Sequence, residues 1–361
     1  MPDAVSAEAP GRVNLIGDHT DYHEGLVLPT VIPQRTRVHL RRRMDQIVSA
    51  HSIAMGPAIV DYELGSEQVS RGWIDYVQGV TVTAARHGIR LSGFDLRIES
   101  SIPPGAGVSS SAALTVSLLR ALRAAFDLAM DDVTIATLAR AAETDFVGAP
   151  IGIMDQMAAS VGLAGQALLI DTRTLDVERV PLPADIEIVV IDSGVPHAHA
   201  GGLYATRRRE SFDAAAQLGV RCLRDVDEAA LARGDGLPPL LARRARHVVT
   251  ENQRVRAAVA AIRAADPVRL GTLFSESHRS MRDDFETSTP HVDALVGIAD
   301  AQPEVYGSRL TGGGFGGAVV ILAKAGTALT TAARIRDVYQ ARTGQIGRIL
   351  MPEINPGQLS M

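Results

Sequence analysis

Residues 103–114 read Pro-Pro-Gly-Ala-Gly-Val-Ser-Ser-Ser-Ala-Ala-Leu, and this stretch decides the interpretation of the chain. It joins an alternating segment at 94–98, which predicts a strand, to an Ala- and Leu-rich segment at 109–128, which predicts a long helix. Glycine allows positive φ and close approach of the backbone, and the first N–H groups of a helix attract phosphate. A plain turn needs only one serine to cap the helix, so three serines in a row favour a phosphate site.

Two further segments are rich in glycine or charge. Residues 9–22 read Ala-Pro-Gly-Arg-Val-Asn-Leu-Ile-Gly-Asp-His-Thr-Asp-Tyr, and we expect a loop that presents Asp18, His19 and Asp21 together. Such a set suits the hydroxyls of a sugar, and an exposed turn with ordinary capping residues is the alternative. Residues 310–317 read Leu-Thr-Gly-Gly-Gly-Phe-Gly-Gly, a run that predicts backbone packed closely against a ligand or another element.

Two acidic residues lie between these segments. Residues 148–156 read Gly-Ala-Pro-Ile-Gly-Ile-Met-Asp-Gln, so Asp155 stands among apolar residues and glycines at the start of an expected helix. Glu143 lies on a predicted helix over 132–147. Taken alone, Asp155 is either an N-cap or a catalytic carboxylate, and Glu143 is either a surface acid or a ligand.

The composition excludes several classes of function. The 36 basic and 41 acidic side chains give a formal charge of −5, which offers no bulk attraction to nucleic acid or to anionic membranes. Lys324 is the only lysine, which excludes a Walker-type phosphate loop and the strand lysine of a protein kinase. One cysteine, Cys222, cannot form an intramolecular disulfide, and with no signal-like amino terminus we expect a cytoplasmic protein.

The length of 361 residues predicts two domains, which we place at residues 1–195 and 196–361. Strand and helix segments interleave without a regular βαβ repeat, so we predict an α+β fold. The strands at 36–40, 47–50 and 59–64 are expected to form an antiparallel meander. The other expected strands are 94–98, 167–171, 186–191, 305–311 and 317–322, and the expected helices are 73–86, 109–128, 132–147, 202–218, 238–263, 267–283 and 328–343.

Together these segments resemble the signature motifs of the GHMP kinase superfamily, and the first is most similar to that of its galactokinase family. The main departure is Asp18, where that family has glutamate. Residues 148–156 and 311–317 also match this family well. The resemblance covers most of the chain and fades through 220–250 and at the carboxyl end.

The resemblance implies a fold and an activity. The fold is an α+β, two-domain GHMP kinase fold, with a ribosomal-protein-S5-like amino-terminal domain, a ferredoxin-like carboxyl-terminal domain and the active site in the cleft between them. The activity is ATP-dependent phosphorylation of galactose at the anomeric C1 hydroxyl, with Mg²⁺ as cofactor. The partners implied are the sugar and ATP alone, on a monomer that contacts neither nucleic acid nor membrane.

The resemblance also implies residue roles. Asp155 lies by the C1 hydroxyl, where it either removes the proton or orients the hydroxyl, and Arg12 lies between Asp155 and the transferred phosphate. Ser111 and Glu143 are the Mg²⁺ ligands. The sugar contacts are Asp18, His19, Asp21, Gly152 and Tyr204. The ATP contacts are Pro104, Gly105, Ala106, Gly107, Val108, Ser109, Ser110, Ser111, Ala112, Gly313 and Gly314.

Two alternatives remain open. The short side chain of Asp18, and Asp192-Ser193 in place of the family's Asn-Ser, leave room for a sugar 1-kinase that acts on another aldose, an amino sugar or a uronic acid. A non-catalytic galactose- and ATP-sensing regulator is the other. Such sensors lack residues of the serine loop, whereas this chain contains Ser111, Arg12 and Asp155.

Overall fold

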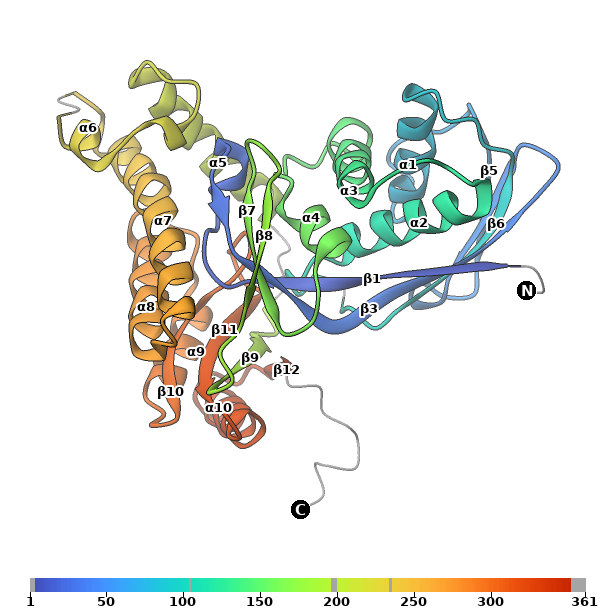
Figure 1. Cartoon of the computed structure of the whole chain (residues 1–361). Coiled ribbons are helices and arrows are strands. Elements are labelled where there is room, and N and C mark those ends of the chain that lie inside the picture. Colours follow the sequence, from blue (N-terminus) through green and yellow to red (C-terminus); the bar gives the residue numbers. More distant parts are fainter. Residues whose placement is uncertain (1–3, 104, 196–199, 234–235, 352–361) are drawn as a thin grey trace. The chain divides into compact units, whose positions relative to one another are not determined.

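The computed structural model describes residues 4–103, 105–195, 200–233 and 236–351 (Figure 1). The chain forms two compact units. The first unit contains residues 1–12, 31–104 and 109–162, and the second contains 13–30, 105–108 and 163–361. Because the chain passes between the units several times, these units are not consecutive segments, and the domain boundary at residue 195 stays a prediction.

The first unit is a sheet with helices on one face (Figure 1). Its strands lie in the order β1-β3-β6-β4-β5, and β1 and β3 continue into the second unit. The strands are β1 (Val5–Asn14), β3 (Pro29–Arg42), β4 (Ile47–Ser52), β5 (Ile59–Glu63) and β6 (Phe94–Ser100). The helices are α1 (Ile74–Arg86), α2 (Ser110–Phe126), α3 (Asp132–Ala141), the π-helix η3 (Ala142–Val147) and α4 (Met154–Val161), with a short 3₁₀ turn η2 (Ile53–Met55) between β4 and β5.

The predicted meander is wrong in one pairing. Strands β3, β4 and β5 are present, but β6 lies between β3 and β4, antiparallel to β3 and parallel to β4. The residues after β3 explain the insertion, because the Arg43 N–H donates to the Gly93 carbonyl at 2.7 Å and the Arg43 side chain pairs with Asp95 at 2.8 Å. These bonds hold β6 against β3, and β4 then pairs with its other edge.

The predicted helix over 132–147 changes geometry near its end. It is α-helical to Ala141 and continues as the π-helix η3. Helix α1 packs against η3 so closely that a Cβ on Gly79 would lie 2.7 Å from the carbonyl oxygen of Ala142. A π-bulge inside a helix is frequently found at a functional site, and this one carries the buried Glu143.

The second unit contains an antiparallel sheet in the order β10-β11-β9-β12. Apolar side chains of β9 and β11 form its core with those of α9 and α10. Two more helices, α7 and α8, pack against each other, and α8 lies on β10. Strands β2 and β8 pair with β7, and β7 also pairs with the start of β3 at Thr30, so these strands belong to the same sheet as β3.

The elements of the second unit have the following bounds. The strands are β2 (Leu26–Val27), β7 (Gln166–Asp171), β8 (Val177–Pro181), β9 (Ile186–Asp192), β10 (Val305–Leu310), β11 (Ala318–Lys324) and β12 (Arg348–Met351). The helices are α5 (Ala200–Gln217), α6 (Glu228–Arg233), α7 (Pro239–Arg263), α8 (Pro267–Asp283), α9 (Pro290–Asp300) and α10 (Ala328–Thr343), with 3₁₀ turns η1 (Asp21–His23) and η4 (Leu223–Asp225).

The predicted α+β class is confirmed, and most predicted elements are present. A helix start near Asp155 was expected and is present as α4, whereas the sequence did not predict α6, α9, β1, β2, β8 or β12. Strand β1 was missed because Pro10 and Gly11 are typical of a loop. Among the described residues, no helix has both the length and the apolar character that a membrane span needs.

Two glycines set the contact between α8 and β10, and this contact yields a stability prediction. A Cβ on Gly271 would lie 2.1 Å from the carbonyl oxygen of Tyr306, and one on Gly307 would lie 2.3 Å from the carbonyl oxygen of Gly271. We expect Gly271→Ala to lower the free energy of unfolding by about 3 kcal/mol, because the backbone must separate. Calorimetric thermal unfolding measures this.

The control is Gly297→Ala on α9. Gly297 is exposed, and a Cβ there would meet nothing within 4 Å. Alanine at this helical position should therefore leave the unfolding temperature unchanged or raise it slightly. Equal unfolding temperatures for Gly271→Ala and the native protein would contradict the prediction.

Candidate functional site

An ion pair between Arg12 and Asp155 forms the centre of the candidate site in the first unit. Arg12 lies on β1 and is buried, and Asp155 is the second residue of α4. Arg12 donates from Nε at 2.9 Å and from Nη2 at 2.6 Å, both to Oδ1 of Asp155. The structure therefore brings together the guanidinium and the carboxylate that the sequence predicts to meet, across 143 positions of the chain.

Ser109 holds the other oxygen of the same carboxylate. Its hydroxyl donates to Oδ2 of Asp155 at 2.6 Å and does not cap α2, which begins at the next residue. Ser109 has φ 64°, a left-handed conformation that is strained for serine and marks a constrained position. The Asp155 side chain keeps 26% of its surface exposed, and a carboxylate has about four lone-pair sites, so it can also accept a substrate hydroxyl.

Glu143 lies near Asp155 and is almost fully buried. Its Oε1 accepts hydrogen bonds from the Thr115 hydroxyl at 3.1 Å and from Nε2 of Gln156 at 2.9 Å, and the Ser111 side chain also bonds to it. Burial is the main cause that raises the pKa of Glu143 to about 7, and the negative Asp155 adds to it. The carboxylate thus lies in an anionic site whose hydrogen-bond partners are neutral.

This environment fits a magnesium ion. Mg²⁺ prefers oxygen ligands and commonly takes one or two from the protein and the rest from phosphates and water. The Glu143 carboxylate and the Ser111 hydroxyl are such a pair, and within the described ranges no three His, Cys, Asp or Glu residues form a larger cluster. A bound cation would supply the positive charge that the buried carboxylate lacks.

Asp18, in the second unit, is bonded to protein atoms through both of its carboxylate oxygens. Arg309 donates from Nη2 to Oδ2 at 2.6 Å, and the Gly312 N–H donates to Oδ1 at 3.0 Å. The residue is 1% exposed. Burial raises the pKa of Asp18, while the Arg309 guanidinium acts in the opposite direction. Both oxygens thus have protein partners, and the sugar contact of Asp18 stays a prediction.

His19 lies in a cluster of rings. Its ring centroid is 5.3 Å from that of Tyr204 and 4.6 Å from that of Phe285, and its Nδ1 lies 2.9 Å from the Tyr22 hydroxyl. Burial lowers the pKa of His19 to about 3, so the imidazole is neutral at physiological pH. A neutral imidazole has one donor and one acceptor nitrogen, which suits a hydroxyl ligand.

The other predicted sugar contacts lie in both units. Asp21 begins η1 in the second unit, and its Oδ1 accepts the Tyr22 N–H at 2.9 Å. Tyr204 lies on α5 in the same unit. Gly152 lies in the first unit, in the segment between η3 and α4 that leads to Asp155.

The glycine loop, residues 312–317, packs against protein atoms. A Cβ on Gly313 would lie 3.1 Å from the Tyr204 ring, and one on Gly314 would lie 2.4 Å from the carbonyl oxygen of Thr287. A Cβ on Gly312 would lie 3.2 Å from the carbonyl oxygen of Gly107. Two of the segments predicted to bind ATP are thus neighbours in the second unit.

The predicted phosphate loop itself has the backbone that its glycines suggest. Gly105 and Gly107 have φ of 75° and 73°. Ala106 and Val108 are buried, and Ser110, Ser111 and Ala112 form the first turn of α2. Pro104 lies outside the described residues.

Three buried polar residues that the sequence did not single out hold the backbone of residues 14–18. Arg309 donates to the carbonyl oxygens of Asn14 and Leu15 at 3.2 and 3.0 Å. The Gly17 N–H donates to Glu251 at 2.9 Å, and Nε2 of His247 lies 3.1 Å from the Asp18 carbonyl oxygen. A charged residue inside an otherwise buried strand or helix face is the signal that could have indicated Arg309 and Glu251.

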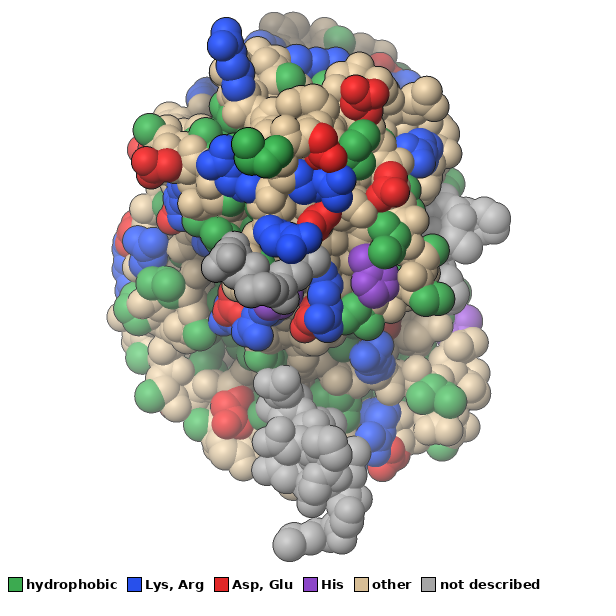
Figure 2. Space-filling model, turned by 90° about the vertical axis from the view of Figure 1, so that its right-hand side faces the viewer, with side chains coloured by type: hydrophobic (Ala, Val, Ile, Leu, Met, Phe, Trp, Pro, Cys, Tyr) green, Lys and Arg blue, Asp and Glu red, His purple; other side chains and the backbone are tan. Residues whose placement is uncertain are grey.

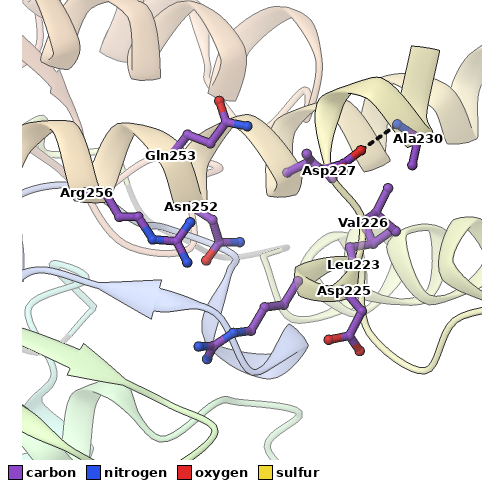
Figure 3. A pocket seen from close by; sticks show the side chains of 10 residues that line it. Leu223, Asp225, Val226, Asp227, Ala230, Asn252, Gln253 and Arg256 are labelled. Atoms are coloured by element: carbon purple, nitrogen blue, oxygen red, sulfur yellow. Dashed lines mark hydrogen bonds between the residues drawn. The ribbon is translucent and has the colours of Figure 1, made fainter.

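A surface pocket in the second unit carries none of the predicted site residues (Figure 3). It lies between η4, α6 and α7, and its polar groups serve the fold. Asp227 accepts the Ala230 N–H at 2.6 Å, which Figure 3 marks with a dashed line, and Asn252 accepts the Leu26 N–H at 2.8 Å. We therefore do not assign a ligand to it.

Residues 41–43 are three consecutive arginines, and all three contact other residues of the first unit. Arg41 and Arg43 pair with Asp95 at 2.6 and 2.8 Å, and Arg42 lies over the Phe126 ring. Figure 2 shows basic side chains (blue) interspersed with acidic ones (red) on the face that it presents. Each arginine of this run thus has a partner within the first unit.

Comparisons with known proteins agree with these motifs. The sequence matches the GHMP kinases N terminal domain family over residues 75–163 and the GHMP kinases C terminal family over 258–341. Residues 2–42 match the galactokinase galactose-binding signature.

Relatives match over nearly the full length. A galactokinase of Chloroflexus aurantiacus is 43% identical over 351 residues, which cover 95% of this chain and 90% of that protein. A galactokinase of Roseiflexus sp. is 42% identical over 363 residues, covering 98% and 92%. The crystal structure of Lactococcus lactis galactokinase complexed with galactose superposes with a TM-score of 0.92 at 30% identity, covering 96% and 92% of the two chains. Methanococcus jannaschii mevalonate kinase shares the fold, with a TM-score of 0.70 at 16% identity over 96% and 98% of the chains.

The high pKa of Glu143 predicts a stability that depends on pH. Its pKa is about 7 in the folded protein against 4.5 ordinarily, so ionised Glu143 opposes folding as the pH rises through this window. We expect Glu143→Gln to be more stable than the native protein at pH 8 without Mg²⁺, by up to about 3 kcal/mol, and this gain to vanish near pH 4.5. Thermal unfolding from pH 4.5 to 8.5 measures it.

Glu228→Gln is the control, because Glu228 is exposed on α6. Its unfolding temperature should follow that of the native protein at every pH. If Glu143→Gln also followed the native curve, the pKa of the buried carboxylate would not be raised, and a cation at this site would lose its electrostatic basis.

Proposed function

The chain belongs to the galactokinase family of GHMP kinases, and we propose that it transfers the γ-phosphoryl group of ATP to the anomeric C1 hydroxyl of galactose, giving galactose 1-phosphate and ADP. The GHMP kinase fold that the motifs predicted is confirmed by the similarity to Lactococcus lactis galactokinase. The assignment of individual residues to this reaction is our proposal.

The observation that carries the proposal is the Arg12–Asp155 pair. Phosphoryl transfer has a loose transition state that spreads charge over the phosphate oxygens, so catalysis depends on positioning and charge neutralisation. A guanidinium has five N–H donors in a fixed plane, so one arginine can hold a carboxylate and contact phosphate oxygens at the same time. Arg12 therefore orients the Asp155 carboxylate and stabilises the negative charge of the phosphoryl group that is transferred.

Asp155 is the residue that receives the C1 hydroxyl. The anomeric hydroxyl is more acidic than an ordinary alcohol, and the oxygens of Asp155 are oriented by Arg12 and Ser109 at 2.6 Å each. An oriented carboxylate can accept the proton late in the transfer, a contribution of about 10²–10⁴ in rate where general-base catalysis applies.

The nucleotide is held without lysine. We assign the ATP phosphates to the backbone of residues 105–112 and to the adjacent Gly313 and Gly314, because loop N–H groups and the first turn of α2 offer donors to anions. Ser111 and Glu143 would hold Mg²⁺. That ion supplies neutralisation of the phosphate charge.

The sugar contacts we assign are His19, Asp21, Tyr204 and Gly152. The neutral imidazole of His19 and the carboxylate of Asp21 supply both kinds of hydrogen bond that hydroxyls need. The Tyr204 ring, packed on Gly313, offers an apolar surface beside them. We propose that the sugar and the nucleotide are the only partners and that the enzyme is a monomer. We also propose that it is cytoplasmic, because the cytoplasm is a reducing compartment and the chain has a single thiol, Cys222.

A panel of sugars tests the proposed reaction. With ATP and Mg²⁺, ADP release measured over galactose, glucose, galactosamine and galacturonate should give the highest kcat/KM for galactose. A higher value for another sugar would move the assignment to a related sugar 1-kinase. No ADP release with any of them would favour the sensor alternative.

Replacing Asp155, the carboxylate proposed to accept the proton of the C1 hydroxyl, tests the mechanism. We expect Asp155→Asn to bind ATP normally and to lose kcat by about 10²-fold or more, because the amide keeps the shape but cannot accept the proton. Asp145→Asn, at an exposed carboxylate on η3, is the matched control and should keep the native kcat. A near-native kcat for Asp155→Asn would remove Asp155 from the chemical step.

A further inference from the structure

Asp18 bridges two points of the chain that flank the start of the glycine loop. Arg309 lies near the end of β10, and Gly312 is the first glycine of the loop that follows it. Asp18 accepts from Arg309 at 2.6 Å through Oδ2 and from the Gly312 N–H at 3.0 Å through Oδ1. The carboxylate thus fixes the direction in which the loop leaves the strand.

Burial, together with these bonds, separates the carboxylate from a sugar, because Asp18 is 1% exposed. Arg309 is fully buried and Asp18 nearly so. A turn of Asp18 toward a ligand would leave a buried guanidinium and a buried N–H without their partner, and such groups are costly when unpaired. The shorter side chain of aspartate, compared with glutamate, also keeps its oxygens close to the backbone that it holds.

The position of Gly312 is restricted from its other side as well. Gly312 has φ 84°, and a Cβ there would lie 3.2 Å from the carbonyl oxygen of Gly107 in the phosphate loop. The next glycine, Gly313, packs against the Tyr204 ring. A shift of the Gly312 backbone therefore acts directly on the neighbouring phosphate loop.

The charges around Asp18 are balanced. Glu251 pairs with Arg254 at 2.7 Å and lies 3.8 Å from Arg309, so two carboxylates and two guanidinium groups form one cluster, of which Arg254 alone is partly exposed. Burial alone would raise the pKa of Glu251, but Arg254 and Arg309 outweigh it and lower this pKa to about 2. Removing the charge of Asp18 unbalances the cluster, while Glu251 remains near Arg309.

We propose that Asp18 is a positioning residue for the backbone that binds the nucleotide. It ties the glycine loop to residues 14–22, which include the assigned sugar contacts His19 and Asp21, without itself contacting the sugar. This inference deepens the proposed function and rests on it, because it takes the glycine loop and residues 105–108 as the ATP-binding backbone. It predicts that changes at Asp18 alter the affinity for ATP and leave the affinity for galactose nearly unchanged.

The test is Asp18→Asn in the full chain. We expect the Kd of a non-hydrolysable ATP analogue, measured by calorimetry with Mg²⁺, and the KM for ATP to rise about tenfold, equivalent to about 1.4 kcal/mol. The Kd for galactose without nucleotide should change by less than about twofold. A tenfold weaker galactose Kd with unchanged ATP affinity would make Asp18 a sugar ligand and overturn the proposal, as would native values for both.

A second variant separates positioning from general stability. Asp18→Asn with Arg309→Gln restores the charge balance but also removes the bonds from Arg309 to the carbonyl oxygens of Asn14 and Leu15, so it should recover part of the ATP affinity. If Asp18→Asn weakens both ligands in step with a lower unfolding temperature and the double variant does not recover, the role is only structural and the proposal fails. Asp337→Asn, at an exposed pair with Arg336, is the control and should match the native protein.

Asp18→Glu is a third variant that tests the proposal independently. One extra methylene in the buried cluster should displace Gly312 and weaken ATP binding, whereas a sugar ligand would keep or improve galactose binding with glutamate. The ATP-analogue titrations need no turnover. If the native protein failed to phosphorylate galactose, the proposed function would fail, while these titrations would still report on Asp18.

Discussion

The ion pair between Arg12 and Asp155 is the interaction on which the candidate site depends. It joins β1 to the first turn of α4. Two elements far apart in sequence are thereby held so that a cation and an anion share one small volume. The strained Ser109 completes the arrangement, because its hydroxyl occupies the second oxygen of Asp155 and so restricts the carboxylate to one orientation. An enzyme with one lysine in the whole chain relies on such fixed arginine geometry, since a guanidinium binds in a defined plane.

In the second unit, buried charged and polar side chains provide hydrogen bonds to an irregular stretch of backbone. Residues 14–18 leave the regular strand, and buried backbone without a regular partner must find hydrogen bonds elsewhere. Arg309, Glu251 and His247 supply them from β10 and α7. Each of these side chains is buried and bonded to backbone as well as to other side chains. The backbone of residues 14–18 is thus shaped by buried side chains from β10 and α7.

Local pattern was sufficient to predict most elements and insufficient to predict how they pair. Helices α8 and α10 match their expected bounds, because Pro267 with the cap of Asp266 begins one and the left-handed Gly344 ends the other. The insertion of β6 between β3 and β4 depends on contacts of Arg43 that no local pattern encodes. The approach of Arg12 to Asp155 was expected only through the resemblance, and the bond between Asp18 and Arg309 spans 291 positions. Single-sequence reasoning indicates which residues are unusual, but it cannot assign their distant partners.

The glycine motif indicated where the backbone is closely packed, but it did not indicate what the backbone packs against. Its glycines were expected to admit either a ligand or another element, and the described contacts are with protein: the Tyr204 ring, the carbonyl of Thr287 and the carbonyl of Gly107. Loop N–H groups can serve a phosphate only if the backbone that carries them is held still, since positioning supplies most of the catalysis in phosphoryl transfer. The close packing of Gly312 to Gly314 and the carboxylate on the Gly312 N–H are the means of holding it. The glycines that we assign to the nucleotide are therefore also required for packing within the protein itself.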